Sequence, residues 1–212
     1  MKLIIFSLIL LLLLYNIFGD LMKAIKSNCT YRQEINKSIF ITKLYKINDI
    51  NLVQYYLDEA KKEYKDATHY CYAYIIDDKK KSSDDKEPGG TAGVPIMEVL
   101  LKNELNYILC IVIRYFGGIK LGAGGLVRAY SSSVSNALTN DNIINIYNGF
   151  KIKIYSDYNN QKHIDYLIKD LKYDKFFNEK VEYIIYVKED CLKIFDNKNI
   201  KYEILSKEKI EI

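Results

Sequence analysis

Hydrophobic and polar residues alternate along the chain in a way that predicts both helices and strands. Ser38–Ile47 is rich in β-branched and aromatic residues, which is typical of a strand. From Asp49 to Ala60 the apolar residues recur at helical spacing, and Asp49 is placed to cap that helix. In His69–Ile76 the period returns to two, with tyrosines on one face, so we expect a half-buried strand.

The middle of the chain predicts a loop, a helix, a buried strand and a longer helix. Asp77–Gly90 is polar and charged, as in a surface loop. Pro95 suits the first turn of a helix, and Tyr107–Phe116 is a nearly unbroken apolar run typical of a central strand. After Gly125 an apolar stripe predicts a helix that ends at about Asn140.

The last part of the chain predicts a small second domain. Its pattern is strand, helix, strand, strand, helix and strand, over the ranges Gly149–Ser156, Asn159–Leu171, Lys172–Phe177, Lys180–Val187, Glu189–Asp196 and Lys201–Leu205. This βαββαβ order is that of a ferredoxin-like domain. We therefore expect an α+β chain, with a first domain over residues 22–148 and a ferredoxin-like domain over residues 149–212.

Residues 3–18 form an almost wholly apolar run within a leader of residues 1–21. As a helix this run reaches about 24 Å, short of the roughly 30 Å of a bilayer's hydrocarbon core. The segment lacks an A-x-A cleavage site, which argues against an ordinary signal peptide. Three interpretations stay open: a membrane anchor with a cytoplasmic body, because more basic residues follow it than precede it, a signal-like segment, or a start-site error with Met22 as the first residue.

The composition is that of a globular protein and narrows the chemistry only a little. Of the 212 residues, 49% are hydrophobic and 27% charged, and the net charge of +4 is too small to indicate nucleic-acid binding by itself. Any anion site must therefore be local. The cysteines form no CxxC pair, which excludes a zinc knuckle and a thioredoxin-type redox motif; they are Cys29, Cys71, Cys110 and Cys191.

A glycine-rich segment with three basic residues follows the predicted central strand. Glycines between a buried strand and a helix let backbone N–H groups approach an anion at the helix N-terminus. The spacing fits neither a Walker A loop nor a dinucleotide fingerprint. We expect an anion- or RNA-binding site built from Arg114, Gly117, Gly118, Lys120, Gly122, Gly124, Gly125 and Arg128.

The position of the basic residues supports that site. Arg128 is expected in the first helical turn, where the dipole disfavours a cation unless an anion compensates. Arg114, Lys120 and Arg128 then converge around a phosphate. The alternative is that the glycines serve tight turning and close packing while the basic residues are solvated. Tyr130 belongs to the apolar stripe of the same helix.

An acidic loop before a Pro-Gly turn is a second candidate site. Its candidate residues are Asp84, Asp85, Glu87 and Thr91. The carboxylates suit Mg²⁺ coordination, acid–base chemistry or salt bridges to the basic segment. The simpler alternative is a solvated loop with Thr91 as a helix cap. His69 is a candidate pocket residue, although a lone strand histidine is more often structural.

Three segments, taken together and in this order, closely resemble the Impact/YigZ family. They are residues 66–74, residues 83–93 and residues 114–130, the last with the signature RYFGGIKLGAGGLVRAY. The resemblance extends over about Met22–Ile212, and family members usually begin near Met22 without an apolar leader. Departures are few: Tyr70, Lys86 and Gly89 stand where the family pattern has Asn, Gly and Ser.

The resemblance implies both a fold and a function. The first domain is expected to have the ribosomal protein S5 domain 2-like fold, and the second that of the last domain of translocating elongation factors. In eukaryotic relatives the Impact domain belongs to a regulator of a stress kinase that controls translation initiation. We therefore expect a cytoplasmic, non-enzymatic translation regulator that contacts RNA or the ribosome, with a translation-control protein as a further partner and with no cofactor.

Two alternatives from other classes stay open. One is an enzyme that acts on a small phosphorylated or nucleotide substrate, with Asp84, Asp85 and Glu87 as proton-transfer groups or Mg²⁺ ligands. The other is a protein-binding module in which both segments are scaffold. A membrane is expected as a partner only if residues 3–18 are retained as an anchor.

Overall fold

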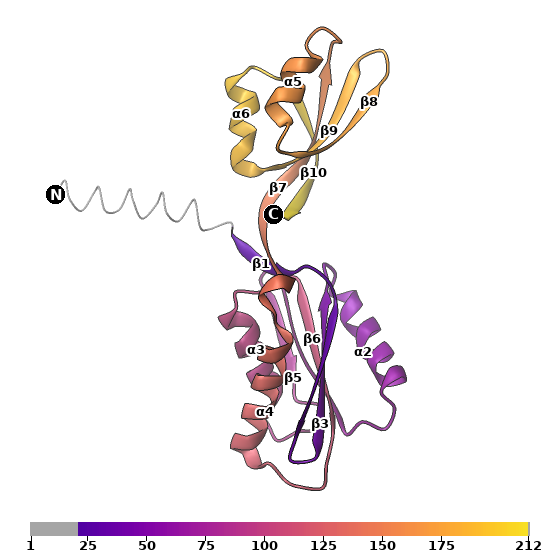
Figure 1. Cartoon of the computed structure of the whole chain (residues 1–212), viewed down its shortest axis with the longest axis vertical. Coiled ribbons are helices and arrows are strands. Elements are labelled where there is room, and N and C mark those ends of the chain that lie inside the picture. Colours follow the sequence, from indigo (N-terminus) through magenta and orange to yellow (C-terminus); the bar gives the residue numbers. More distant parts are fainter. Residues whose placement is uncertain (1–20, 212) are drawn as a thin grey trace, which may run out of the picture. The chain divides into compact units, whose positions relative to one another are not determined.

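The computed structural model describes residues 21–211, so the apolar run predicted over residues 3–18 lies outside the described residues. The chain divides into two compact units, the first over Met22–Ile144 and the second from Asn145 onward (Figure 1). No helix in the described part of the chain is long and apolar enough to span a bilayer. Both units are mixtures of helices and antiparallel strands, as the α+β prediction requires.

The first unit is a five-stranded antiparallel sheet with helices on both faces. Its strands lie in the order β2-β3-β6-β4-β5. The elements are β1 (Met22–Ile25), β2 (Cys29–Ile35), β3 (Ser38–Lys46), α2 (Asn51–Glu63), β4 (His69–Ile76), β5 (Lys79–Ser83), α3 (Gly93–Lys102), β6 (Ile108–Tyr115), α4 (Gly122–Ala137) and the 3-10 turn η1 (Asn140–Asn142).

The strand β6 lies at the centre of this sheet, as its apolar run predicts. Residues 108–113 are all fully buried, because α3 and α4 cover one face of the sheet and α2 covers the other (Figure 1). The core under α3 and α4 includes Phe40, Cys71, Cys110, Ile96, Leu126 and Tyr130. The side chain of Arg114 follows on the same face as Cys110 and Val112, because side chains alternate along a strand.

The loop before α3 and the start of α2 differ from the prediction. The loop expected over Asp77–Gly90 contains β5, which pairs with β4 as an edge strand after a turn at Asp77, where φ is +53°. Because β5 consists of lysines and serines, it lacks the hydrophobic alternation that would predict a strand. Lysines are typical of an exposed edge strand. The cap of α2 is Ile50 and not Asp49, although the Asp49 carboxylate accepts a hydrogen bond from the N–H of Asn51 at 2.9 Å.

The second unit has the predicted βαββαβ order. Its antiparallel strands lie in the order β10-β7-β9-β8. The elements are β7 (Ile143–Ser156), α5 (Gln161–Ile168), β8 (Lys172–Phe177), β9 (Val181–Lys188), the 3-10 turn η2 (Glu189–Cys191), α6 (Leu192–Asn197) and β10 (Tyr202–Glu211). Both helices pack on one face of the sheet, over a core that includes Ile152, Ile154, Tyr183, Ile185, Ile164 and Phe195.

Candidate functional site

The residues singled out from the sequence gather at one end of the first sheet. Strand register places Phe40, Arg114 and His69 side by side on β3, β6 and β4. The acidic loop and α4 approach the same end, since Glu87 pairs with Arg114 and the Tyr130 ring packs edge-on against Phe40. Segments far apart in the sequence therefore meet around a single buried carboxylate.

A buried ion pair holds this end of the sheet together. The Nη1 atom of Arg114 lies 2.6 Å from Oε1 of Glu87, and the two side chains are 5% and 3% exposed. The hydroxyl of Tyr130 donates to the same oxygen at 2.8 Å. The guanidinium also lies 5.4 Å from the ring centroid of Phe40 and 5.6 Å from that of Phe116. Arg114 is thus the counter-ion of Glu87 and does not present its charge to solvent.

His69 and Cys71 extend this polar cluster along β4. The Nδ1 atom of His69 lies 2.8 Å from the backbone carbonyl of Asp85, and its Nε2 atom lies 3.7 Å from Oε1 of Glu87. The Cys71 thiol donates to the carbonyl of Asp84 at 3.0 Å. Burial raises the pKa of the Cys71 thiol well above its ordinary value, so it stays protonated and is not a reactive nucleophile.

The acidic loop is tied to the fold through its carboxylates. Asp84 accepts hydrogen bonds from the backbone N–H groups of Gly90, Ala92 and Gly93 at 2.9, 3.0 and 2.7 Å. Burial acts to raise the pKa of the Asp84 carboxyl, but these N–H groups outweigh burial and lower the pKa. The carboxylate of Asp85 accepts from the N–H of Tyr70 at 2.7 Å.

The cap of α3 is therefore not the one predicted. Ala92 is the N-cap residue, and the Asp84 carboxylate, from another part of the loop, satisfies the free N–H groups of Ala92 and Gly93. The Thr91 hydroxyl instead donates to the carbonyl of Pro88 at 2.6 Å. Neither Asp84 nor Glu87 belongs to a simple solvated loop, since both support the local fold.

The glycine-rich segment differs from the prediction in where its helix begins. α4 starts at Gly122, so Gly124 and Gly125 are helical and Arg128 lies in the second turn. The first-turn argument for an anion beside Arg128 is consequently wrong. Because glycine is a weak helix former, the sequence predicts that this helix begins only after Gly125.

The fold itself requires some of these glycines. A Cβ atom on Gly117 would lie 2.0 Å from the carbonyl carbon of Lys37, in the turn between β2 and β3. Gly118 and Gly122 have φ of +84° and +69°, in the left-handed region. Gly124 has neither constraint, because a Cβ atom there would meet nothing within 4 Å.

The three basic residues of the segment have two different environments. Arg114 is buried against Glu87, whereas Lys120 and Arg128 are exposed. Neither exposed residue forms an ion pair or a side-chain hydrogen bond with the described part of the chain. The expected set of three phosphate-binding cations is thus reduced to Lys120 and Arg128.

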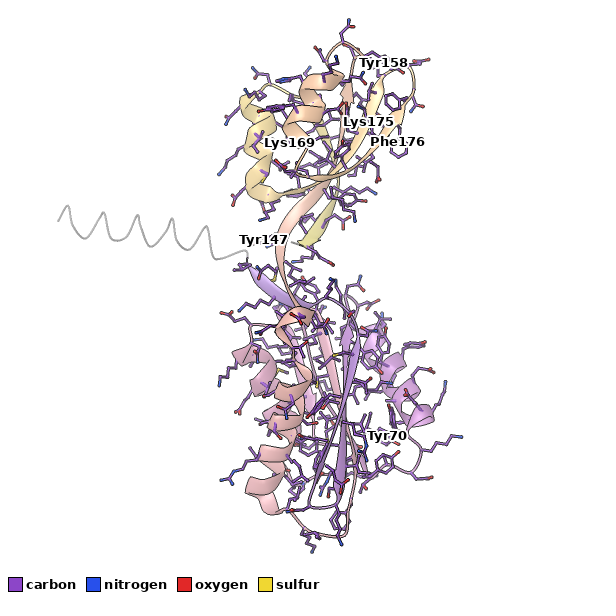
Figure 2. All side chains as sticks on the ribbon, viewed as in Figure 1. Tyr70, Tyr147, Tyr158, Lys169, Lys175 and Phe176 are labelled. Carbon is purple, nitrogen blue, oxygen red and sulfur yellow. The ribbon has the colours of Figure 1, made fainter. Side chains whose placement is uncertain are left out.

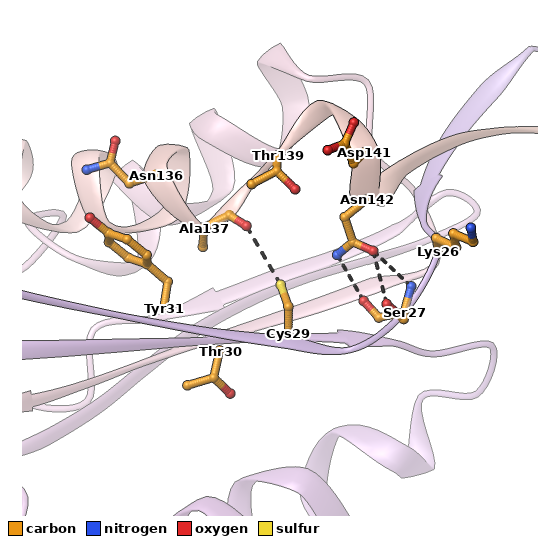
Figure 3. Close-up of a pocket in the computed structure, with 10 residues that line it drawn as sticks. All are labelled: Lys26, Ser27, Cys29, Thr30, Tyr31, Asn136, Ala137, Thr139, Asp141 and Asn142. Atoms are coloured by element: carbon orange, nitrogen blue, oxygen red, sulfur yellow. Dashed lines mark hydrogen bonds between the residues drawn. The ribbon is translucent and has the colours of Figure 1, made fainter.

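The first unit has a hollow that is separate from the predicted site residues. Within residues 21–211 no group of three or more His, Cys, Asp and Glu side chains is arranged to hold a metal ion. A hollow of about 450 Å³ lies between β2 and the end of α4, away from every predicted site residue (Figure 3). Its Asn142 side chain is engaged by Ser27, whose N–H and hydroxyl donate to Oδ1 at 3.0 and 3.2 Å.

Sequence reasoning missed two members of the buried cluster. Tyr130 was assigned only to an apolar stripe, and its hydroxyl contact with Glu87 leaves no periodic signal. Ser38 was assigned only to a strand, yet its hydroxyl accepts from Arg114 Nη2 at 3.4 Å and from the N–H of Gly117 at 3.2 Å. The Ser38 contacts depend on the register of β3 against β6, and the Tyr130 contact depends on where α4 meets the acidic loop. A single sequence reveals neither.

The fold and the site define a class of protein: a two-unit α+β chain whose first sheet is closed at one end by an acidic loop and a glycine-rich helix start. A family model described as the Impact N-terminal domain matches residues 36–138. The chain belongs to this IMPACT family, as the resemblance of its motifs predicts.

Curated relatives and a solved structure agree with this assignment. The chain is 40% identical to "IMPACT family member YvyE" of Bacillus subtilis, over 73% of this chain and 74% of the relative. It is 40% identical to "IMPACT family member YigZ" of Escherichia coli, over 51% of this chain and 56% of the relative. A crystal structure described as that of a hypothetical protein matches 88% of this chain and 97% of its own, with a TM-score of 0.60 and 28% identity.

Proposed function

We propose that this chain is a cytoplasmic regulator of translation that contacts RNA or the ribosome through the glycine-rich start of α4. We further propose that its first unit has the ribosomal protein S5 domain 2-like fold and its second unit the ferredoxin-like fold. The strand order β10-β7-β9-β8 supports the second assignment. The function needs neither a catalytic residue nor a cofactor.

One observation carries this proposal: the exposed cations of the segment are not neutralised by the acidic loop beside it. Glu87 is paired with buried Arg114, and Asp84 is engaged by backbone N–H groups. Lys120 and Arg128 keep their charge available to a partner, since no ion pair engages them within residues 21–211. A phosphate backbone suits these two exposed cations, Lys120 just before α4 and Arg128 in its second turn.

The exposed backbone of the glycines near these cations also supports a phosphate contact. Gly118, Gly122 and Gly124 each face open space, where a Cβ atom would contact no other part of the chain. Glycine in a helix is roughly 0.5–1 kcal/mol less favourable than alanine. No contact within residues 21–211 requires glycine at position 124, and close approach of a ligand to the helix supplies a reason for it.

The same contacts weigh against the enzyme alternative. That alternative uses Asp84 and Glu87 as proton-transfer groups or Mg²⁺ ligands. Glu87 is buried with Arg114 and Tyr130, and Asp84 supports the start of α3. The protein-binding alternative retains support from the side chains of Phe116 and Ile119, which are 47% and 45% exposed beside Lys120.

The test is binding of the full chain to purified ribosomes and to total RNA at several salt concentrations. Lys120→Ala/Arg128→Ala is expected to weaken binding and to lower the slope of log affinity against log salt by up to about two, one for each lost phosphate contact. The matched control is Lys80→Ala/Lys102→Ala, which removes two exposed lysines from other parts of the first unit. Binding that needs a protein partner and ignores RNA would favour the protein-binding module instead.

A further inference from the structure

No helix of the described residues 145–211 covers the second face of the sheet in the second unit. Alternate residues of β7 and β9 point into the core under α5 and α6, among them Ile152 and Ile185. Side chains alternate along a strand, so Lys151 and Tyr186 point to the opposite face. Register places Lys151, Tyr186 and Lys172 in one row across β7, β9 and β8.

Aromatic rings and ammonium groups meet along this row. The Nζ atoms of Lys151 and Lys172 lie 5.6 and 5.2 Å from the ring centroid of Tyr186. The Nζ atom of Lys188 lies 3.5 Å from the ring centroid of Tyr147, which Figure 2 labels on β7. Two rings thus alternate with three cations at the same end of the open face.

These cations have no carboxylate partner in the part of the chain that the structure describes. Lys151, Lys172 and Lys188 form no ion pair with any residue between 21 and 211. Lys153, the next lysine on the same face, differs because it is paired with Glu182 at 2.9 Å. Two unpaired ammonium groups over one ring repel each other, and a polyanion placed between them removes that repulsion.

The nearby acidic residues limit the extent of the surface. Register places Glu203 beside Lys153 and Asp174 beside Ile184, one row away from Tyr186. Glu208, at the β10 edge, accepts a hydrogen bond from the Ser206 hydroxyl at 2.7 Å. Register also places Glu208 beside Gly149, in the row of Lys188. The positive part of the face is therefore confined to a short strip.

We propose that the strip formed by Lys151, Lys172, Lys188, Tyr147 and Tyr186 binds a single-stranded polynucleotide. Such a chain alternates planar bases with phosphates, which matches rings that alternate with ammonium groups. A peptide of acidic residues alone would meet the lysines but has no planar rings to stack on the tyrosines. This inference deepens the proposed RNA contact, on which it rests, by adding a second surface in the other unit and by naming single strands as its ligand.

The test measures fluorescence anisotropy of labelled U12 RNA and T12 DNA with the full chain. Tyr186→Leu is expected to weaken binding about tenfold, whereas Tyr186→Phe retains the ring and the affinity. Lys151→Ala/Lys172→Ala weakens binding and lowers its salt dependence. Weaker binding of T12 than of U12 assigns the strip to RNA, and equal binding assigns it to single strands of either kind.

The matched control lies on the helix side of the same unit. Tyr166 is 69% exposed on α5, and Lys169, labelled in Figure 2, lies 5.2 Å from its ring. Tyr166→Leu/Lys169→Ala removes the same chemistry and is expected to leave binding unchanged. Circular dichroism melting of every variant separates lost binding from lost fold.

Three results overturn the inference. One is U12 binding that is unchanged in Tyr186→Leu, and another is no U12 or T12 binding by the unaltered chain. The third is competition by poly-glutamate as strong as that by unlabelled U12, because it would show that charge alone is recognised. Lys120→Ala/Arg128→Ala is measured beside these variants, so that a failure of the glycine-rich surface and a failure of the strip are seen separately.

Discussion

Arg114 and Arg128 belong to one short motif but have opposite environments. Arg114 lies near the end of the central strand β6, where its side chain is 5% exposed and paired with Glu87, whereas Arg128 lies exposed in the second turn of α4. The first arginine keeps a buried carboxylate neutralised, and the second leaves its charge to a partner. A motif of this kind thus combines residues that build the fold with residues that are free for recognition.

The largest predicted effect concerns Arg114, the buried arginine of the motif. Arg114→Met removes the counter-ion of Glu87 and leaves a buried charge without compensation, so we expect a loss of about 3–5 kcal/mol in the free energy of unfolding. Urea unfolding followed by circular dichroism measures it. The matched variant Arg128→Met is expected to stay within about 0.5 kcal/mol. Equal losses of unfolding free energy in both variants would contradict the structural role assigned to Arg114 alone.

The acidic loop is expected to show a smaller, pH-dependent effect. Asp84→Ala leaves N–H groups at the start of α3 without their acceptor and is expected to cost about 1–2 kcal/mol at neutral pH. The folded pKa of Asp84 is lowered, so its contribution is present above an unfolded value of about 3.9 and is lost as the pH falls through the folded value. The difference between Asp84→Ala and the unaltered chain should therefore narrow in acid. A constant difference between pH 7 and pH 2 would contradict the assigned role.

Gly124 gives a prediction in which stability and binding change in opposite directions. Gly124→Ala adds a methyl group in open space on a helix and is expected to raise stability by about 0.5 kcal/mol. The same methyl group obstructs close approach of RNA, so affinity should fall. Gly117→Ala is the contrasting variant, since its Cβ atom would lie 2.0 Å from the backbone of Lys37 and should destabilise the fold. RNA affinity that is unchanged in Gly124→Ala would assign this glycine no part in recognition.

Lys86 gives the smallest predicted effect. It stands where the family pattern has glycine and takes a φ of +70°, which is strained for a residue with a side chain. Lys86→Gly relieves that strain but makes the unfolded chain more flexible, so we expect a net gain of about 0.5 kcal/mol. Lys80→Gly, in β5, has no strain to relieve and should lower stability. Thermal unfolding shows whether each variant gains or loses stability.

Much of the fold could be predicted from periodicity, while the electrostatics of the site could not. The central strand β6 and the βαββαβ order of the second unit follow from local patterns. The pairing of Arg114 with Glu87 joins residues 27 positions apart and depends on where the acidic loop crosses the sheet. The sequence therefore presents Arg114, Lys120 and Arg128 as equivalent cations.

The lysine strip of the second unit was not predicted for a similar reason. Lys151 and Lys172 come together over Tyr186 only because β9 lies between β7 and β8. The order of elements along the chain predicts a sheet but does not state which side chains share a row. Lysines and tyrosines are also frequent throughout this chain, with 20 tyrosines in all. A local group of them in the sequence therefore does not indicate a binding surface.

The most direct test of the central claim is to measure RNA affinity and unfolding free energy in the same samples of Lys120→Ala/Arg128→Ala. We expect the salt slope of binding to fall by up to about two while stability changes by less than about 0.5 kcal/mol. An unchanged affinity and slope in a fully folded variant would contradict it.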